Sequence, residues 1–208
     1  MAKALRIEVA SDVICPWCYI GKRRLAQAIA LLDGEIEPRI EWLPFQLNPA
    51  MPPEGVARME YRRAKFGSLE RSRELDARVA REGAGEGIRF AFDRMERTPN
   101  TMPAHRLIDV AQRQQKAEAV VDALFRAYFE DARDIGNESV LAEIAAECSV
   151  AEWPQAADPI RVAALEEQVR EWGISGVPTF IFDRRSGISG AYPPAELAAA
   201  IRAAAVER

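Results

Sequence analysis

The sequence predicts an α/β fold: a mixed central sheet flanked by helices, with a large all-helical insertion. Apolar and polar residues alternate near the N-terminus and an apolar run returns near residue 180, both typical of strands. Between these regions, residues 56–151 carry no strand pattern and repeat apolar side chains every three or four positions. Of the 208 residues, 49% are hydrophobic and 29% charged, which is typical of a folded chain with a sizeable core.

The first half of the sheet domain follows in order. Residues 5–10 alternate as a strand does, and this strand leads directly into a Cys-x-x-Cys motif at Cys15 and Cys18. Pro16 favours a helix start at this point, and Gly34 favours its end. A second strand is predicted at about residues 39–45, followed by a proline-rich loop.

The middle of the chain predicts helices at 117–130 and 138–147, each with an apolar face. The dense mixed charge of residues 57–86 is typical of a solvated helical face. After residue 159 a helical pattern ends at Gly173.

Residues 178–182 then predict a strand, a short strand follows near residue 188, and residues 194–206 form a last helix. This order is that of the thioredoxin fold. We predict a discontinuous thioredoxin-fold domain at 1–55 and 152–208, with a helical insertion domain at 56–151.

The charge balance excludes several classes of protein. Lys and Arg number 28 against 32 Asp and Glu, so the basic excess of a nucleic-acid-binding protein is missing. The longest apolar run, residues 13–20, is shorter than a membrane span and contains a proline. Arg6 and Glu8 interrupt the stretch where a secretory signal would be apolar, which predicts a cytoplasmic protein.

The Cys15-Pro16-Trp17-Cys18 segment predicts redox chemistry. Cysteines three positions apart at a helix start share one face and lie within reach of a disulfide bond. The unpaired amides of the helix N-terminus favour a thiolate and predict a lowered pKa for Cys15, the expected nucleophile. Cys18, one turn further, is the expected resolving thiol.

Two other interpretations of this motif stay open. A structural zinc site would have to use Cys15, Cys18, Cys148 and His105, without a second Cys-x-x-Cys pair. Alternatively, the two cysteines are buried and inert. Cys148 is alone in its segment and is predicted to be a small, partly buried thiol.

Pro178 stands at the head of an apolar strand, where it gives up a ladder N–H. Its combination with the Cys-x-x-Cys motif predicts a cis peptide bond after Val177. The alternative is an ordinary trans proline that begins a strand.

Five segments together resemble the DsbA-like thioredoxin-fold superfamily, specifically its FrnE-like branch. The resemblance implies a thiol-disulfide oxidoreductase or protein disulfide isomerase, with Cys15 as nucleophile, Cys18 as resolving thiol and Pro178 as the cis-proline. It implies that substrates are cysteine-containing proteins or peptides, and that no cofactor is needed beyond the redox-active disulfide. The segments are residues 11–25, 44–49, 104–107, 124–129 and 176–182.

The resemblance also predicts residues that contact substrate. Val177 would offer its backbone to an extended peptide by strand addition. Pro16, Trp17 and Thr179 are predicted beside it. Insertion residues in this superfamily approach the site, and they correspond here to Asn100 and His105; a helix-packing role for His105 is the alternative.

The same superfamily includes kappa-class glutathione transferases and 2-hydroxychromene-2-carboxylate isomerases, which provide an alternative function. These relatives usually carry serine at the first position of the motif, so Cys15 favours dithiol chemistry. Glutathione as reductant stays open, as does a non-catalytic binding protein. The oligomeric state also stays open, with a homodimer as one alternative.

Overall fold

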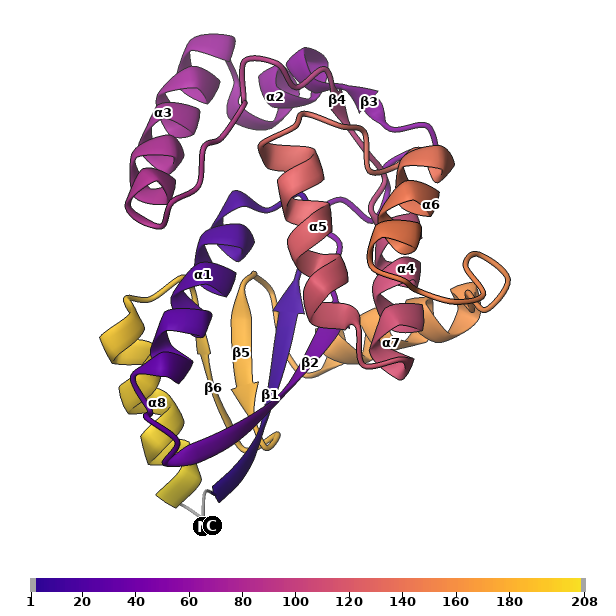
Figure 1. The fold of residues 1–208 in the computed structure, drawn as a ribbon. Helices are drawn as coiled ribbons and strands as arrows, with labels where there is room; N and C mark the ends of the chain where they lie inside the picture. The colour runs from indigo at the N-terminus through magenta and orange to yellow at the C-terminus, as the bar shows by residue number, and fades with distance from the viewer. Residues whose placement is uncertain (1–2, 207–208) are drawn as a thin grey trace.

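A four-stranded mixed sheet forms the base of the protein in a computed structural model that describes residues 3–206 (Figure 1). The strands are β1 (Lys3–Ser11), β2 (Ile36–Pro44), β5 (Thr179–Phe182) and β6 (Ser186–Ser189), in the order β2-β1-β5-β6. β1 is parallel to β2 and antiparallel to β5, and β6 is antiparallel to β5. This arrangement confirms the predicted fold class.

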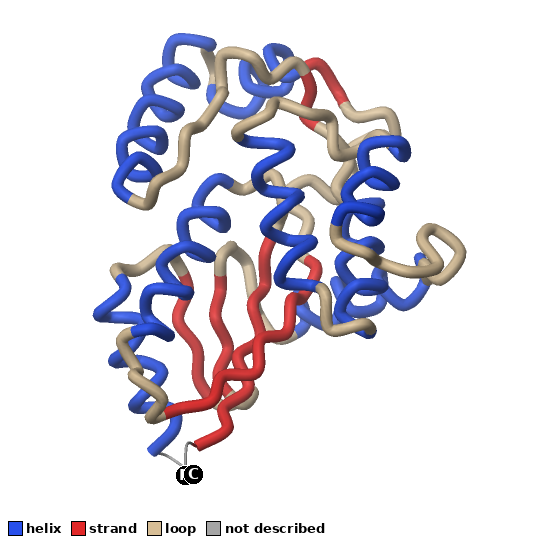
Figure 2. Tube along the Cα trace, viewed as in Figure 1, coloured by secondary structure: helices blue, strands red, loops and turns tan. Residues whose placement is uncertain are grey.

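Side chains on β1 alternate between two layers, as the strand pleat requires. Leu5, Ile7 and Val9 belong to the main core, which they share with residues of the helices α1 (Pro16–Ala30) and α8 (Pro194–Val206). Ala10 lies in a second small core with Val169 of α7 (Pro159–Glu171). Helices therefore cover both faces of the sheet (Figure 2).

The insertion is mostly helical, with one feature that the sequence analysis did not predict. β3 (Val56–Ala57) and β4 (Arg97–Thr98) pair as a two-stranded antiparallel sheet. Strands of two residues are too short to show an alternating pattern. The helices of the insertion are α2 (Arg58–Phe66), α3 (Leu69–Gly85), α4 (Met102–Arg113), α5 (Ala117–Phe129) and α6 (Glu138–Glu147).

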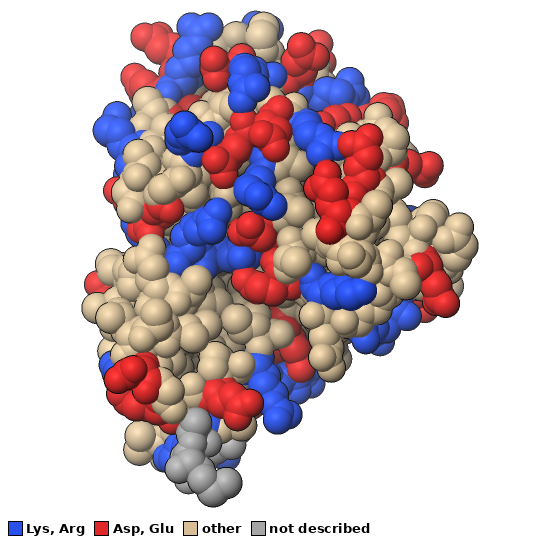
Figure 3. Space-filling view, in the orientation of Figure 1, with Lys and Arg blue, Asp and Glu red and all other residues tan. Residues whose placement is uncertain are grey.

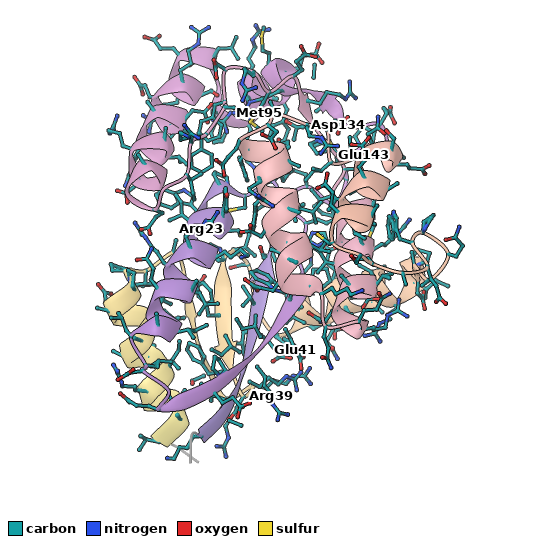
Figure 4. The ribbon with its side chains drawn as sticks, in the orientation of Figure 1. Arg23, Arg39, Glu41, Met95, Asp134 and Glu143 are labelled. Carbon is teal, nitrogen blue, oxygen red and sulfur yellow. The ribbon has the colours of Figure 1, made fainter. Side chains whose placement is uncertain are left out.

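Aromatic packing joins the insertion to α1. The ring of Tyr19 stacks on Phe125 of α5, with 5.0 Å between centroids, and both side chains are fully buried. The Tyr19 hydroxyl donates to Glu130 over 2.6 Å, and burial together with this hydrogen bond raises the tyrosine pKa to about 12. Arg23, labelled in Figure 4, donates to the same hydroxyl and lies 3.6 Å from Asp122 of α5. These contacts hold α5 against α1.

Basic and acidic side chains are interspersed over the face seen in Figure 3, most densely over the insertion. Within residues 3–206, no helix has the length and apolar composition needed to cross a membrane. The same described part of the chain holds no cluster of three or more His, Cys, Asp or Glu arranged to bind a metal ion.

Candidate active site

The two cysteines of the motif lie at the N-terminus of α1. The chain turns after β1 because the Cys15 amide donates to the Asp12 carbonyl over 3.0 Å. Cys15 is the extended N-cap residue, and Pro16 occupies the first helical turn, where a missing N–H costs nothing. Both thiols are free, and the Cys18 side chain interacts with that of Cys15.

Cys18 lies behind Cys15 in the core. Burial raises the pKa of the Cys18 thiol well above its ordinary value, and the neighbouring Cys15 raises it further. Interactions with Ser11 and with the Asp12 backbone oppose this shift without reversing it. In the free dithiol, Cys18 is therefore a neutral thiol near pH 7.

The loop before β5 faces the motif from the other side. The Cys15 thiol donates to the carbonyl oxygen of Val177, with 3.7 Å between sulfur and oxygen. The Val177–Pro178 peptide bond is cis, and the Pro178 carbonyl accepts from the Gly190 amide over 2.8 Å. Two segments distant in sequence thus meet at the Cys15 sulfur.

A buried acidic side chain, Asp12, lies next to the motif and contacts two other segments. Asp12 is fully buried, and its Oδ2 accepts from the Leu47 amide over 2.7 Å. Its Oδ1 lies 3.6 Å from Nε2 of His105, which is also buried. Asp12 therefore connects the motif, the loop after β2 and helix α4.

Cys15 opens onto a cleft of about 580 Å³ between the thioredoxin-fold elements and the insertion. Pro16, Trp17 and Val177 line it beside Cys15. The opposite wall comes from α2 and α3, which Figure 1 shows beyond the N-terminal end of α1. A volume in this range suits a small ligand or a few residues of a peptide.

Three residues predicted to contact substrate lie outside the lining of this cleft. Thr179 is buried, and its hydroxyl hydrogen-bonds with the Gly176 carbonyl and Ser189. Asn100 donates to the Met51 carbonyl over 2.6 Å and thereby holds a loop. His105 is buried against Asp12 and does not line the cleft.

The sequence analysis missed the far wall of the cleft. Tyr61 and Lys65 of α2 and Arg78 of α3 line it, together with Leu47 from the loop after β2. The signal for the α2 residues was their spacing of four, which puts them on one helical face. Nothing in the local pattern indicates that this face turns toward Cys15.

Comparison with known proteins assigns the chain to a family. The model of the DsbA-like thioredoxin domain matches residues 6–202, so the chain belongs to that family. Membership supports an enzyme of the thiol-disulfide kind.

Three individual proteins are similar to this chain. A probable DsbA oxidoreductase from Streptomyces coelicolor superposes with a TM-score of 0.89 at 29% identity, covering 98% of this chain and 91% of that one. An uncharacterized protein of Bacillus subtilis (strain 168) is 26% identical over 85% of this chain and 86% of its own length. The cytosolic disulfide reductase DsbM from Pseudomonas aeruginosa, solved with GSH, shares the fold at 18% identity and a TM-score of 0.64, covering 95% of this chain and 98% of that one.

Proposed function

We propose that this protein is a FrnE-like thiol-disulfide oxidoreductase that acts through the Cys15-Pro16-Trp17-Cys18 dithiol on cysteine-containing peptides and proteins. The observation that carries the proposal is the asymmetry of the dithiol. Both cysteines are largely buried, but Cys15, at the helix N-terminus, lines the cleft, whereas Cys18 lies outside its lining and has a raised pKa. The Cys15 sulfur is therefore the one that a substrate in the cleft can reach, and Cys18 is placed to attack it from the protein side.

The reduction of a substrate disulfide proceeds in two exchanges. The Cys15 thiolate attacks one substrate sulfur, a bond forms between them, the substrate S–S bond breaks, and the other substrate sulfur leaves and takes up a proton. Cys18 then loses its proton and attacks the Cys15 sulfur, which forms the Cys15–Cys18 disulfide and releases the second substrate thiol. Two electrons pass from the dithiol to the substrate.

Turnover needs the dithiol to be regenerated. A low-molecular-weight thiol of the glutathione class supplies the two electrons when two of its molecules join as a disulfide. Isomerisation needs no net electrons, because the Cys15 mixed disulfide is resolved by another cysteine of the same substrate. A reversible dithiol of this kind suits a cytoplasmic location, where protein disulfides are mostly transient.

The Val177 segment would bind the substrate backbone. Its carbonyl lies 3.7 Å from the Cys15 sulfur, so an extended peptide whose cysteine reaches Cys15 passes directly beside it. Strand addition would give affinity without demanding a particular sequence. Pro16 and Trp17 line the cleft next to this position and would contact the residues that flank the substrate cysteine.

Insulin reduction and refolding of scrambled ribonuclease test the proposal. We expect Cys15→Ser to lose activity in both assays and Cys18→Ser to accumulate a mixed disulfide with substrate. Cys148→Ser is the matched control, since Cys148 ends α6 outside the cleft lining, and it should keep full activity. Full activity of Cys15→Ser would overturn the proposal.

A glutathione-dependent isomerase or transferase is the second candidate. The size of the cleft favours it, as does the shared fold of a 2-hydroxychromene-2-carboxylate isomerase, with a TM-score of 0.66 at 14% identity. In that case turnover of a small aromatic substrate would depend on glutathione and survive Cys18→Ser. Dithiol oxidoreduction predicts the reverse for Cys18→Ser.

A further inference from the structure

The wall of the cleft opposite Cys15 is strongly basic, although the whole chain carries a net charge of −4. Four cationic side chains line the cleft against one carboxylate, that of Asp76. The cationic residues are Arg58, Arg62, Lys65 and Arg78.

Two of these cations share the single carboxylate. Arg58 pairs with Asp76 over 2.9 Å, and Arg62 pairs with the other oxygen of the same carboxylate. Arg62 also stacks over Phe66, 4.3 Å from its ring centroid. Burial raises the pKa of Asp76, although the two arginines oppose this shift. The Asp76 carboxylate thus forms ion pairs with both guanidinium groups of this wall.

The other two cations have no carboxylate partner within residues 3–206. Lys65 donates to the Tyr61 hydroxyl over 2.6 Å and lies 5.1 Å from the centroid of that ring, so it is oriented but not neutralised. Arg78 is exposed, and no ion pair involves it in this described part of the chain. The wall therefore presents a net excess of three positive charges to whatever reacts at Cys15.

We propose that Lys65 and Arg78 select thiols and disulfides that carry carboxylates close to the reacting sulfur. The inference rests on the proposed function, because it concerns which substrates the Cys15 dithiol prefers. A cleft lined by charges of one sign concentrates ligands of the opposite sign and speeds their encounter. Acidic peptide segments and glutathione share this chemistry, since both place carboxylates within a few bonds of a sulfur.

The test uses disulfides of one peptide series with 2-thiopyridine as a neutral leaving group. The central cysteine is flanked by two glutamates, two glutamines or two lysines on each side. Attack of Cys15 on the peptide sulfur releases 2-thiopyridone, whose absorbance reports the rate with the reduced full-length protein. We expect the acidic peptide to react at least about tenfold faster than the basic peptide at low salt, and the difference to shrink as salt rises.

A matched pair of double variants assigns this preference to the cleft. Lys65→Glu with Arg78→Glu should reverse the order, so that the basic peptide reacts faster than the acidic one. Arg63→Glu with Arg81→Glu makes the same charge change on exposed positions of the same two helices outside the cleft lining, and it should keep the wild-type order. If the charge reversals prevent folding, Lys65→Gln with Arg78→Gln is used instead, and it should reduce the difference in rate between the acidic and the basic peptide.

A second pair of substrates distinguishes glutathione from acidic protein segments as the preferred carboxylate-bearing substrate. The pair is glutathionyl-2-pyridyl disulfide and its dimethyl ester. A slower reaction of the ester supports recognition of glutathione, and a preference confined to the peptides supports acidic protein segments. Equal rates for all three peptides together with equal rates for glutathione and its ester would overturn this inference and leave the proposed function standing. If no substrate reacts with the wild type, both fail.

Discussion

Gly21 of α1 and Pro178 lie in direct contact, and a Cβ on the glycine would be 2.9 Å from the proline Cγ. The proline ring cannot rotate away as a flexible side chain does. The absence of a side chain at Gly21 therefore lets the helix that carries the dithiol approach the loop that carries Val177.

Gly21→Ala should displace this loop from Cys15. We expect a net loss of about 1–3 kcal/mol in the free energy of unfolding, because overpacking outweighs the better helix propensity of alanine. The rate of Cys15 mixed-disulfide formation should fall with it. Urea unfolding and the thiopyridine assay measure the two effects.

Gly85→Ala is the control for this substitution, since a Cβ at Gly85 would meet no atom within 4 Å. That variant should be unchanged or more stable by up to about 1 kcal/mol. Equal stability changes in the two variants would contradict the role assigned to the Gly21–Pro178 contact.

The raised pKa of Cys18 predicts how stability depends on pH. Folding favours the neutral Cys18 thiol, which therefore contributes to the free energy of unfolding. This contribution is complete below the ordinary thiol pKa of about 8.5 and is lost as pH rises toward the folded-state pKa. Reduced protein should lose up to about 1.4 kcal/mol per pH unit through this group in that window.

Cys18→Ala removes the group and should show a shallower decline of unfolding free energy over the same pH range. Urea titrations of both proteins under reducing conditions measure the difference, because the tyrosine contributions are common to both. Parallel curves would exclude the buried thiol as the source of the slope.

Asp12 holds the loop after β2 through the Leu47 amide. Asp12→Ala leaves this N–H without its acceptor, so we expect a loss of about 1–3 kcal/mol in unfolding free energy. Asp12→Asn keeps an acceptor oxygen and should lose less. Thermal or urea unfolding compares the variants, and identical losses would argue that the charge near His105, rather than the Leu47 hydrogen bond, supplies the stability.

The stacked pair Tyr19 and Phe125 predicts that the insertion and the sheet unfold together. Phe125→Ala should cost about 3–5 kcal/mol, as expected for a fully buried ring. Tyr19→Phe keeps the stack and loses the hydrogen bond to Glu130, which should cost about 1 kcal/mol. Unfolding followed by both fluorescence and circular dichroism should give coincident transitions for the wild type.

The local elements could be predicted from the sequence because each has a local cause. The alternation of residues 5–10 gave a strand that the structure extends to Lys3–Ser11, and the apolar periodicity gave α5 and α6 within one residue of their ends. Pro16 placed the start of α1, and with it Cys15 at the N-cap. The paired strands β3 and β4 were not predicted, because a strand of two residues is too short to show an alternating pattern.

For the site, the amino-acid sequence by itself determined the dithiol, since the three-residue spacing of Cys15 and Cys18 and the helix start at Pro16 are properties of one short segment. Only the tertiary structure decided what faces that dithiol. Lys65 and Arg78 line the cleft while Thr179 and Asn100 do not, because these positions depend on how α2, α3 and the loops pack against α1. Such packing arises from contacts between distant segments, and no local periodicity encodes which face of a charged helix they turn toward a thiol.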